Sequence, residues 1–250
     1  MKTLFINGSP KKKLSASSYF IALQKLFVKG QKVSLNLRTK ADYQPILNEL
    51  HNVDNVVFCL PLYVDGVPSH VLRFMEVMES YCSDNNLHCH VYVIANNGFI
   101  EGRQNEPLMQ VFEHFCTHAN LTFGGGVGVG GGVMLNVTRI LFFVDIALLL
   151  LNIILSVVHS GNFFPVESWI SFIENALLLL FFNCGVLFYL CRMGMKMNKG
   201  EIAGKKYTRI MLPSFVFIIF ADIFFIIVSI FEGGLFRGWL SKKSLDHPIA

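Results

Sequence analysis

Charged residues are scarce in this sequence of 250 residues, and the basic ones form no long stripe. Asp, Glu, Lys and Arg together make up 15% of the chain, and the formal net charge of +4 comes from small clusters. The sequence also lacks a repeated set of aromatic residues that could stack on bases. Proteins that bind nucleic acid usually carry a basic face or such an aromatic platform. The sequence therefore predicts no nucleic-acid partner.

The six cysteines include no Cys-x-x-Cys pair, and the chain starts with a strand-like segment in place of a cleavable signal peptide. These features predict that the soluble part of the chain is cytosolic and that its cysteines are reduced. Residues 88–90 (His-Cys-His) and 114–118 raise the alternative of a zinc site. A strand would point Cys89 away from its neighbours, however, and a helix would turn Cys116 away from the two histidines beside it. The prediction is therefore that the chain has no metal site.

Apolar residues make up 53% of the chain and are concentrated beyond residue 139. Residues 1–132 instead alternate strand-like and helix-like segments. The strand-like residues 56–60 and 91–95 are continuously apolar, as expected for a parallel sheet covered on both faces. The pattern predicts an α/β fold with a doubly wound, five-stranded parallel sheet in the order 2-1-3-4-5. The expected strands are 3–7, 32–37, 54–60, 89–95 and 121–126, and the expected helices are 15–28, 43–51, 68–81 and 105–119.

The turn after the first strand is typical of a phosphate-binding loop. Residues 7–13 read Asn-Gly-Ser-Pro-Lys-Lys-Lys, and residues 15–18 read Ser-Ala-Ser-Ser. Gly8 lets the backbone approach an anion, while serine hydroxyls and the first amides of a helix can donate to phosphate oxygens. The alternative is an ordinary strand-to-helix turn with a solvated run of lysines.

Two further loops would meet this turn at the same edge of the sheet. Residues 61–68 read Pro-Leu-Tyr-Val-Asp-Gly-Val-Pro, and residues 96–102 read Asn-Asn-Gly-Phe-Ile-Glu-Gly. In the order 2-1-3-4-5, the loops after strands one, three and four converge where ligands bind. Aromatic rings, free backbone amides and side-chain amides suit a flat heteroaromatic ring. The three loops together favour a nucleotide-like cofactor.

With these motifs, residues 1–132 resemble the flavodoxin-like NADPH-dependent FMN reductase family, which includes many NAD(P)H-dependent oxidoreductases. The resemblance implies FMN as the cofactor and NADPH or NADH as the co-substrate. It also implies a set of binding residues in three groups. The FMN phosphate would be held by Ser9, Lys11, Ser15, Ser17 and Ser18, the isoalloxazine would pack by Pro61, Leu62, Tyr63 and Val64, and its pyrimidine end would be bordered by Asn97, Gly98 and Phe99.

This chain departs from the family pattern in one pair of residues, and the resemblance implies three further properties. Many relatives carry an Asn-Thr pair in the phosphate loop, where this chain has Ser15-Ala16. Because a flavin accepts hydride itself, no catalytic side chain is expected, and no Ser/His/Asp or Cys/His arrangement is apparent. Electrons would pass to a small-molecule acceptor. Relatives are often dimers, which implies a homodimer here.

The glycine-rich residues 124–132 could be taken for a dinucleotide-binding fingerprint. They follow the last expected strand, however, and no helix with a downstream acidic residue comes after them. The sequence therefore favours a flexible linker or a loop packed beside the flavin, serving as the joint to the second half of the chain.

Residues 133–250 are predicted to form a transmembrane helical region of about three helices. The expected spans are 139–158, 168–191 and 212–231, each near the ~20 residues that a bilayer requires. Residues 192–209 are rich in lysine and arginine, whereas 159–167 contain neither. The positive-inside rule then places residues 192–209 and the N-terminal domain in the cytoplasm. This predicts a multi-pass protein of the cell membrane, with the lipid bilayer as its partner.

Each expected span carries one acidic residue: Asp145, Glu174 and Asp222. Such residues either move protons or bind ligands, or they hold helices together by hydrogen bonds. The sequence as a whole favours a membrane-anchored FMN-dependent NAD(P)H oxidoreductase, for which the tether suggests a quinone-like acceptor. The alternatives are a non-enzymatic module in which a nucleotide- or partner-binding domain regulates the helices, and a small oligomeric transporter.

Overall fold

The computed structural model describes residues 1–12 and 14–231, which belong to two compact units. The first unit is Met1–Met211, and the second begins at Leu212. The described part of the second unit contains the apolar helix α7 (Ser214–Phe231). The expected boundary between residues 132 and 133 falls inside the first unit, so the chain after residue 132 contributes to the same compact body as the α/β part.

The first unit is built on a parallel sheet in the order β2-β1-β3-β4-β5-β6. The predicted order of the first five strands is confirmed, but the prediction of five strands is wrong, because a sixth is added beside β5. The strands are β1 (Lys2–Asn7), β2 (Gln31–Asn36), β3 (Asn55–Pro61), β4 (His90–Asn96), β5 (Thr122–Gly130) and β6 (Gly204–Arg209).

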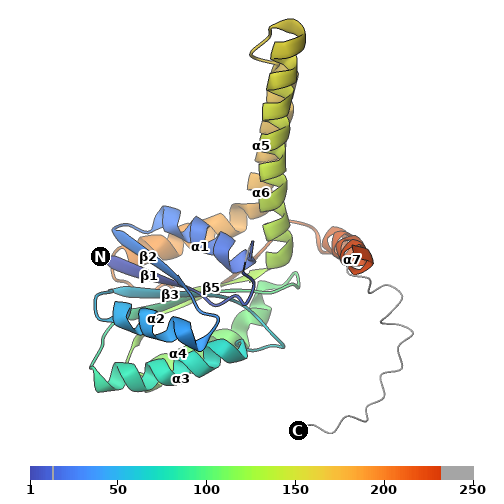
Figure 1. Ribbon diagram of the computed structural model, residues 1–250. Helices are drawn as coiled ribbons and strands as arrows, with labels where there is room; N and C mark the ends of the chain where they lie inside the picture. Colours follow the sequence, from blue (N-terminus) through green and yellow to red (C-terminus); the bar gives the residue numbers. More distant parts are fainter. Residues whose placement is uncertain (13, 232–250) are drawn as a thin grey trace, which may run out of the picture. The chain divides into compact units, whose positions relative to one another are not determined.

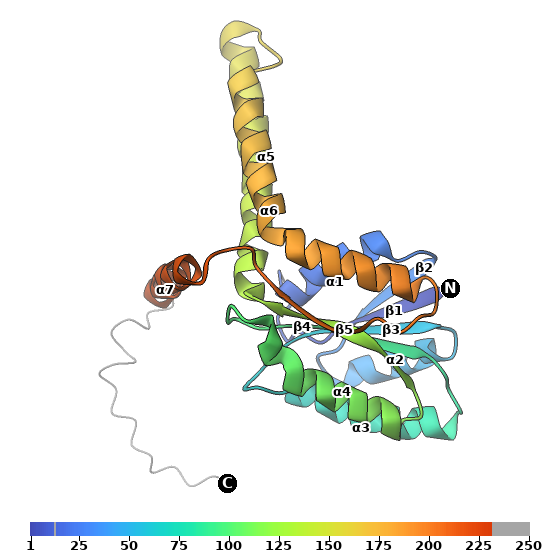
Figure 2. The ribbon, with the colours of Figure 1, turned by 180° about the vertical axis from the view of Figure 1, so that it is seen from behind.

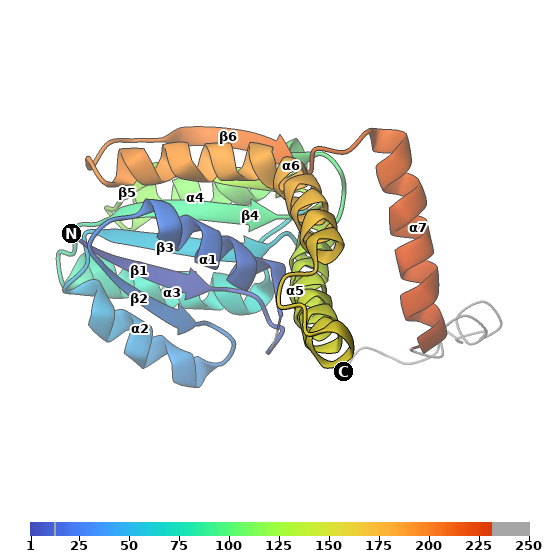
Figure 3. The ribbon, with the colours of Figure 1, turned by 90° about the horizontal axis from the view of Figure 1, so that it is seen from above.

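Helices cover both faces of this sheet (Figures 1 and 3). One face carries α1 (Ala16–Phe27), and the other carries α2 (Tyr43–Leu50), α3 (Ser69–Asp84) and α4 (Glu106–His118). The apolar strands β3 and β4 are therefore buried on both sides, as their sequences predict. Phe58 of β3 meets Phe112 of α4 with ring centroids 5.0 Å apart in this core.

The glycine-rich segment is a strand and not the expected linker or loop. β5 runs to Gly130, beyond the predicted end at residue 126. Its neighbours lie very close to the backbone: a Cβ atom on Gly130 would lie 2.1 Å from the carbonyl oxygen of Ile100. The glycines therefore permit close packing around β5, which lies between β4 and β6.

The sequence does not predict the sixth strand, because charged residues are uncommon in strands that are added to a buried sheet. β6 has the sequence Gly-Lys-Lys-Tyr-Thr-Arg and lies within the basic segment 192–209. Lys205 Nζ lies 3.0 Å from Glu106 Oε1 and 2.9 Å from Glu113 Oε2 on α4, and the Tyr207 hydroxyl donates to Glu106. These partners hold the pKa of Glu106 below its ordinary value, chiefly through the Tyr207 hydrogen bond. These side-chain contacts connect the charged strand β6 to α4 at the edge of the sheet.

A long helical hairpin rises from the sheet after β5 (Figure 1). It consists of α5 (Gly132–Ser160) and the first half of α6 (Val166–Met197). In the part of the chain that the structure describes, these two helices, of 29 and 32 residues, are the ones long and apolar enough to cross a membrane. α7 is also apolar but has only 18 residues, so two full-length helices replace the three expected ones. Asn175 Nδ2 donates to Asp145 Oδ1 across the hairpin at 3.4 Å.

The second half of α6 returns to the sheet and completes the fold. Figure 2 shows α6 changing direction where it reaches the sheet. The Phe182 carbonyl of α6 accepts a hydrogen bond from Met211 N at 3.1 Å. Beyond the bend, Val186, Leu190 and Met193 are buried on one face of the helix. The predicted span 168–191 lies within α6, but its last residues belong to the half of the helix that packs against α1, β5 and β6.

Candidate functional site

Three loops meet at the edge formed by the carboxyl ends of the strands. The register pairs Asn7 of β1 with Cys59 of β3, and Pro61 with Asn96 of β4. Backbone hydrogen bonds then tie each loop to the neighbouring strand, from Gly8 N to Cys59 O at 2.9 Å and from Leu62 N to Asn96 O at 2.8 Å. The predicted convergence of these loops is confirmed, and it places their side chains at the edge where doubly wound sheets bind ligands.

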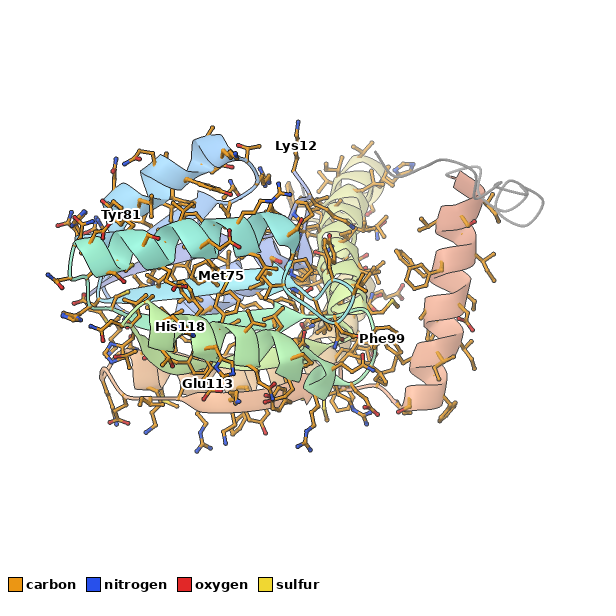
Figure 4. The ribbon with its side chains drawn as sticks, turned by 90° about the horizontal axis from the view of Figure 1, so that it is seen from below. Lys12, Met75, Tyr81, Phe99, Glu113 and His118 are labelled. Carbon is orange, nitrogen blue, oxygen red and sulfur yellow. The ribbon has the colours of Figure 1, made fainter. Side chains whose placement is uncertain are left out.

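The first loop is held in shape by its own polar side chains. Asn7 Oδ1 accepts from Ser9 N at 3.1 Å, and Ser9 Oγ accepts from Lys11 N at 3.4 Å. A Cβ atom on Gly8 would lie 3.1 Å from both Leu60 Cβ and Val71 Cγ2, so glycine lets the turn lie against the next strand and helix. The side chains of Lys11 and Lys12 are exposed, and Figure 4 shows Lys12 projecting into solvent.

The loop leads into the N-terminus of α1, which carries the first free amides of a helix. Ser15 is the N-cap, and its Oγ accepts from Ser18 N at 3.1 Å. The amides of Ala16 and Ser17 lie in the first turn and have no acceptor within the helix. These amides, the helix dipole and the nearby lysines form an anion-attracting end next to the loop.

The five residues predicted to hold phosphate are not equivalent in the structure. Ser9 and Lys11 belong to the loop itself, and Ser15 is engaged in capping. Ser18 Oγ donates to the Ser15 carbonyl oxygen at 2.7 Å. Ser17 is buried, and its Oγ accepts from Asn96 Nδ2 at 3.4 Å, so this hydroxyl faces β4 and not the open side of the loop. Ser17 can therefore contribute its amide but not its side chain to an anion at the loop.

The second loop forms a tight turn that presents apolar side chains. Tyr63 and Gly66 exchange backbone hydrogen bonds of 3.0 and 2.9 Å, and Val64 and Asp65 have φ values of 46° and 56°. A positive φ is strained for a β-branched residue such as valine, and strain of this kind clusters at ligand sites. Val64 is fully exposed, and Tyr63 is 44% exposed. Partial burial raises the pKa of the Tyr63 phenol.

The third loop is anchored to β5 and to the start of α5. Asn97 N donates to Val129 O at 3.1 Å, and Asn97 Nδ2 donates to Glu101 O at 2.9 Å. Asn97 Oδ1 is buried and has no hydrogen-bond partner among the described residues. Phe99 is 61% exposed at the end of the sheet from which α5 departs (Figure 4). This loop therefore offers an unused acceptor and an exposed aromatic ring.

Arg139 was not recognised as a site residue in the sequence, because it stood at the start of an expected span. Its Nη1 lies 3.5 Å from Ser18 Oγ, and its Cζ lies 5.5 Å from the centroid of the Tyr19 ring. One turn earlier, Asn136 Nδ2 donates to the Leu14 carbonyl oxygen at 2.9 Å. The first turns of α5 therefore contact the predicted phosphate loop, which adds a cation beside the first turn of α1.

The cysteine and histidine groups do not assemble at this edge. Burial raises the pKa of Cys89 and of Cys116 to about 12, so both thiols are protonated at neutral pH. Within residues 1–12 and 14–231, no group of three or more His, Cys, Asp or Glu side chains is arranged to hold a metal ion.

Comparisons with known proteins find distant structural similarity and no match in sequence. No family model matches the sequence, and no curated protein matches it. Among solved structures, the Trp repressor binding protein from Bacillus subtilis is 20% identical, with a TM-score of 0.43 over 52% of this chain and 84% of its own. An NADPH-quinone reductase from P. pentosaceus is 17% identical, with a TM-score of 0.44 over 52% of this chain and 86% of its own. An FMN-dependent NADH-azoreductase from Bacillus anthracis, in complex with FMN, is 13% identical, with a TM-score of 0.34 over 52% of this chain and 88% of its own.

Proposed function

We propose that this chain is a membrane-anchored, FMN-dependent NAD(P)H oxidoreductase. The observation that carries the proposal is the convergence of three chemically distinct loops at one edge of a sheet in the order β2-β1-β3-β4-β5-β6. One loop attracts anions, one presents Tyr63 and Val64, and one presents Asn97 and Phe99. A phosphate joined to a flat, amphipathic ring system combines the chemistry that these three loops suit.

The residues present fit FMN. Ser9, Lys11 and the amides of Ala16 and Ser17 would hold its phosphate, Tyr63 and Phe99 would flank its ring, and Asn97 Oδ1 would accept from a ring N–H. When bound, FMN supplies the capacity to accept hydride from NADPH or NADH and to pass electrons on. The protein's task is then to orient the ring and to leave one side of it open to the nicotinamide. No side chain needs to act as an acid or base.

The membrane anchoring rests on the hairpin. α5, with 29 residues, exceeds the ~20 residues that span a bilayer, and the half of α6 before the bend runs beside it. The leucine, isoleucine and phenylalanine side chains on the outer faces of this hairpin are largely exposed. Because α5 starts at β5 and α6 ends on the sheet, the hairpin leaves and returns on the domain's own side of the membrane. The basic residues 192–209 lie on that side, so the positive-inside rule places the domain in the cytoplasm. This location favours a lipid-soluble, quinone-like acceptor.

The first test is anaerobic titration of the full-length protein, purified in detergent, with NADPH and with NADH. We expect a flavin absorbance near 450 nm that bleaches on addition of one of the two nucleotides, and that returns when a soluble quinone is added. Flavin that binds but does not bleach would instead identify a non-enzymatic module. A protein that neither carries flavin nor gains thermal stability from added FMN would contradict the cofactor assignment.

A double substitution tests the phosphate loop. Ser9→Ala combined with Lys11→Ala should weaken FMN binding by at least about tenfold, because it removes one hydroxyl donor and one cation from the proposed phosphate site. Equilibrium titration followed by flavin fluorescence measures the change. Ser80→Ala with Lys29→Ala is the matched control, since both residues are exposed and lie away from the three loops. Equal FMN affinity in the two double variants would show that the phosphate lies elsewhere.

A further inference from the structure

A cavity lies at the foot of the hairpin, between α1, α5 and α6. Its volume is about 420 Å³, and most of the side chains that line it are apolar, among them Phe142, Leu179 and Leu187. It is separate from the three loops at the sheet edge, because it lies along the outer side of α1 at Tyr19 and Leu23. The cavity is therefore an apolar groove between the domain and the part of the chain proposed to enter the membrane.

Three polar residues at one side of the groove satisfy one another. The Tyr19 hydroxyl donates to Asn183 Oδ1 at 2.8 Å, and Asn183 Nδ2 donates to Leu179 O at 2.8 Å and to Thr138 Oγ1 at 3.3 Å. Thr138 Oγ1 in turn donates to Leu135 O at 2.7 Å. These groups join the domain to the hairpin and leave little hydrogen-bonding capacity for a ligand.

Arg139 is the exception among the polar residues of the groove. Its Nη1 reaches Ser18 Oγ, but its Nε and Nη2 atoms are buried without a hydrogen-bond partner among the described residues. The lining of the groove contains no Asp or Glu that could pair with it. Because a guanidinium stays charged and two of its donor atoms have no acceptor among the described residues, an anionic partner would satisfy them. The planar fork of arginine matches the oxygens of a phosphate group.

We propose that this groove binds an anionic phospholipid, with the phosphate at Arg139 and an acyl chain along Phe142, Leu179 and Leu187. This inference rests on the membrane insertion of the proposed function, but not on its redox activity. The groove combines one guanidinium, which no carboxylate of the lining neutralises, with an apolar channel at the foot of the hairpin, and an anionic amphiphile complements both. Bound lipid would join α1, α5 and α6 at the level of the bilayer surface.

The test uses full-length protein in detergent, with added dioleoyl phosphatidylglycerol or dioleoyl phosphatidylcholine. Native mass spectrometry and thermal unfolding report lipid binding without requiring flavin. We expect the anionic lipid to bind about tenfold more tightly than the zwitterionic one. Arg139→Gln should abolish this preference, Arg139→Lys should keep part of it, and Ala176→Phe should weaken both lipids by filling the groove. Arg73→Gln is the matched control, because it removes the same charge from the exposed surface of α3.

Three results would overturn the proposal. The first is an unchanged lipid preference in Arg139→Gln. The second is a loss of FMN affinity in that variant with lipid preference intact, which would assign Arg139 to the cofactor phosphate. The third is equal stabilisation by inorganic phosphate and by the anionic lipid, which would remove the role of the acyl chain. A protein that binds no FMN but prefers the anionic lipid through Arg139 would refute the redox function and support the lipid site.

Discussion

Leu190→Ala is expected to destabilise the α/β domain by about 2–5 kcal/mol, although residue 190 lies in a sequence segment that reads as membrane-spanning. Leu190 has 0% exposure and lies on the half of α6 that packs against α1, β5 and β6. Removing its side chain leaves a cavity in a closely packed interior, because the surrounding helices and strands relax only partly. If the residue faced lipid instead, the substitution would cost far less.

Urea-induced unfolding in detergent, followed by circular dichroism, measures this change as a lower midpoint with an unchanged slope. Leu26→Ala is the matched control, because Leu26 lies on α1 with 73% of its surface exposed, and we expect its effect to stay within about 0.5 kcal/mol. Equal midpoints for the two variants would mean that the second half of α6 does not cover the sheet.

The sequence predicts the sheet better than it predicts the helices that cover the sheet. Leu190 shows why, because its segment could face either lipid or a protein core. β3 and β4 are short apolar runs bounded by turns, as expected for buried parallel strands, so the sheet and the order of its first five strands could be anticipated. In α6, residues that face the sheet and residues that face outward are both apolar and follow one another without a break. Because lipid and protein core select the same side chains, hydropathy does not separate Leu190 from Leu180.

The sequence also does not predict β6 or the position of Arg139, because both depend on contacts between residues far apart in the chain. β6 is charged, and it forms a parallel ladder with β5 and ion pairs from Lys205 to Glu106 and Glu113, all of which are far away in the sequence. The three loops were predictable because each follows a strand end, whereas Arg139 reaches Ser18 only through the packing of α5 on α1. The residues that form a turn lie next to one another in the sequence, whereas the contact between two helices depends on how the whole chain folds.

The hairpin itself should be removable without loss of the domain. Thr138 Oγ1 and Asn183 Nδ2 are 3.3 Å apart, so the two helices already lie side by side where they leave the sheet. A turn of about four glycine and serine residues in place of residues 142–179 would therefore join them, as such turns join neighbouring antiparallel helices. With the chain also ended at residue 211, which removes α7, the variant keeps every strand and the half of α6 that covers the sheet.

We expect this variant to be soluble without detergent and to bind FMN as the full-length protein does, while the full-length protein stays in the membrane fraction after lysis. The two partial variants are the controls. Truncation alone leaves the hairpin, so this variant should remain with the membrane because its long apolar helices persist. Excision alone leaves α7, an apolar helix of 18 residues, and measures whether α7 by itself keeps the protein at the membrane. Soluble full-length protein would refute the anchoring. A double variant that aggregates, or that unfolds without cooperativity, would mean that the hairpin is part of the core and not an insertion between β5 and the covering half of α6.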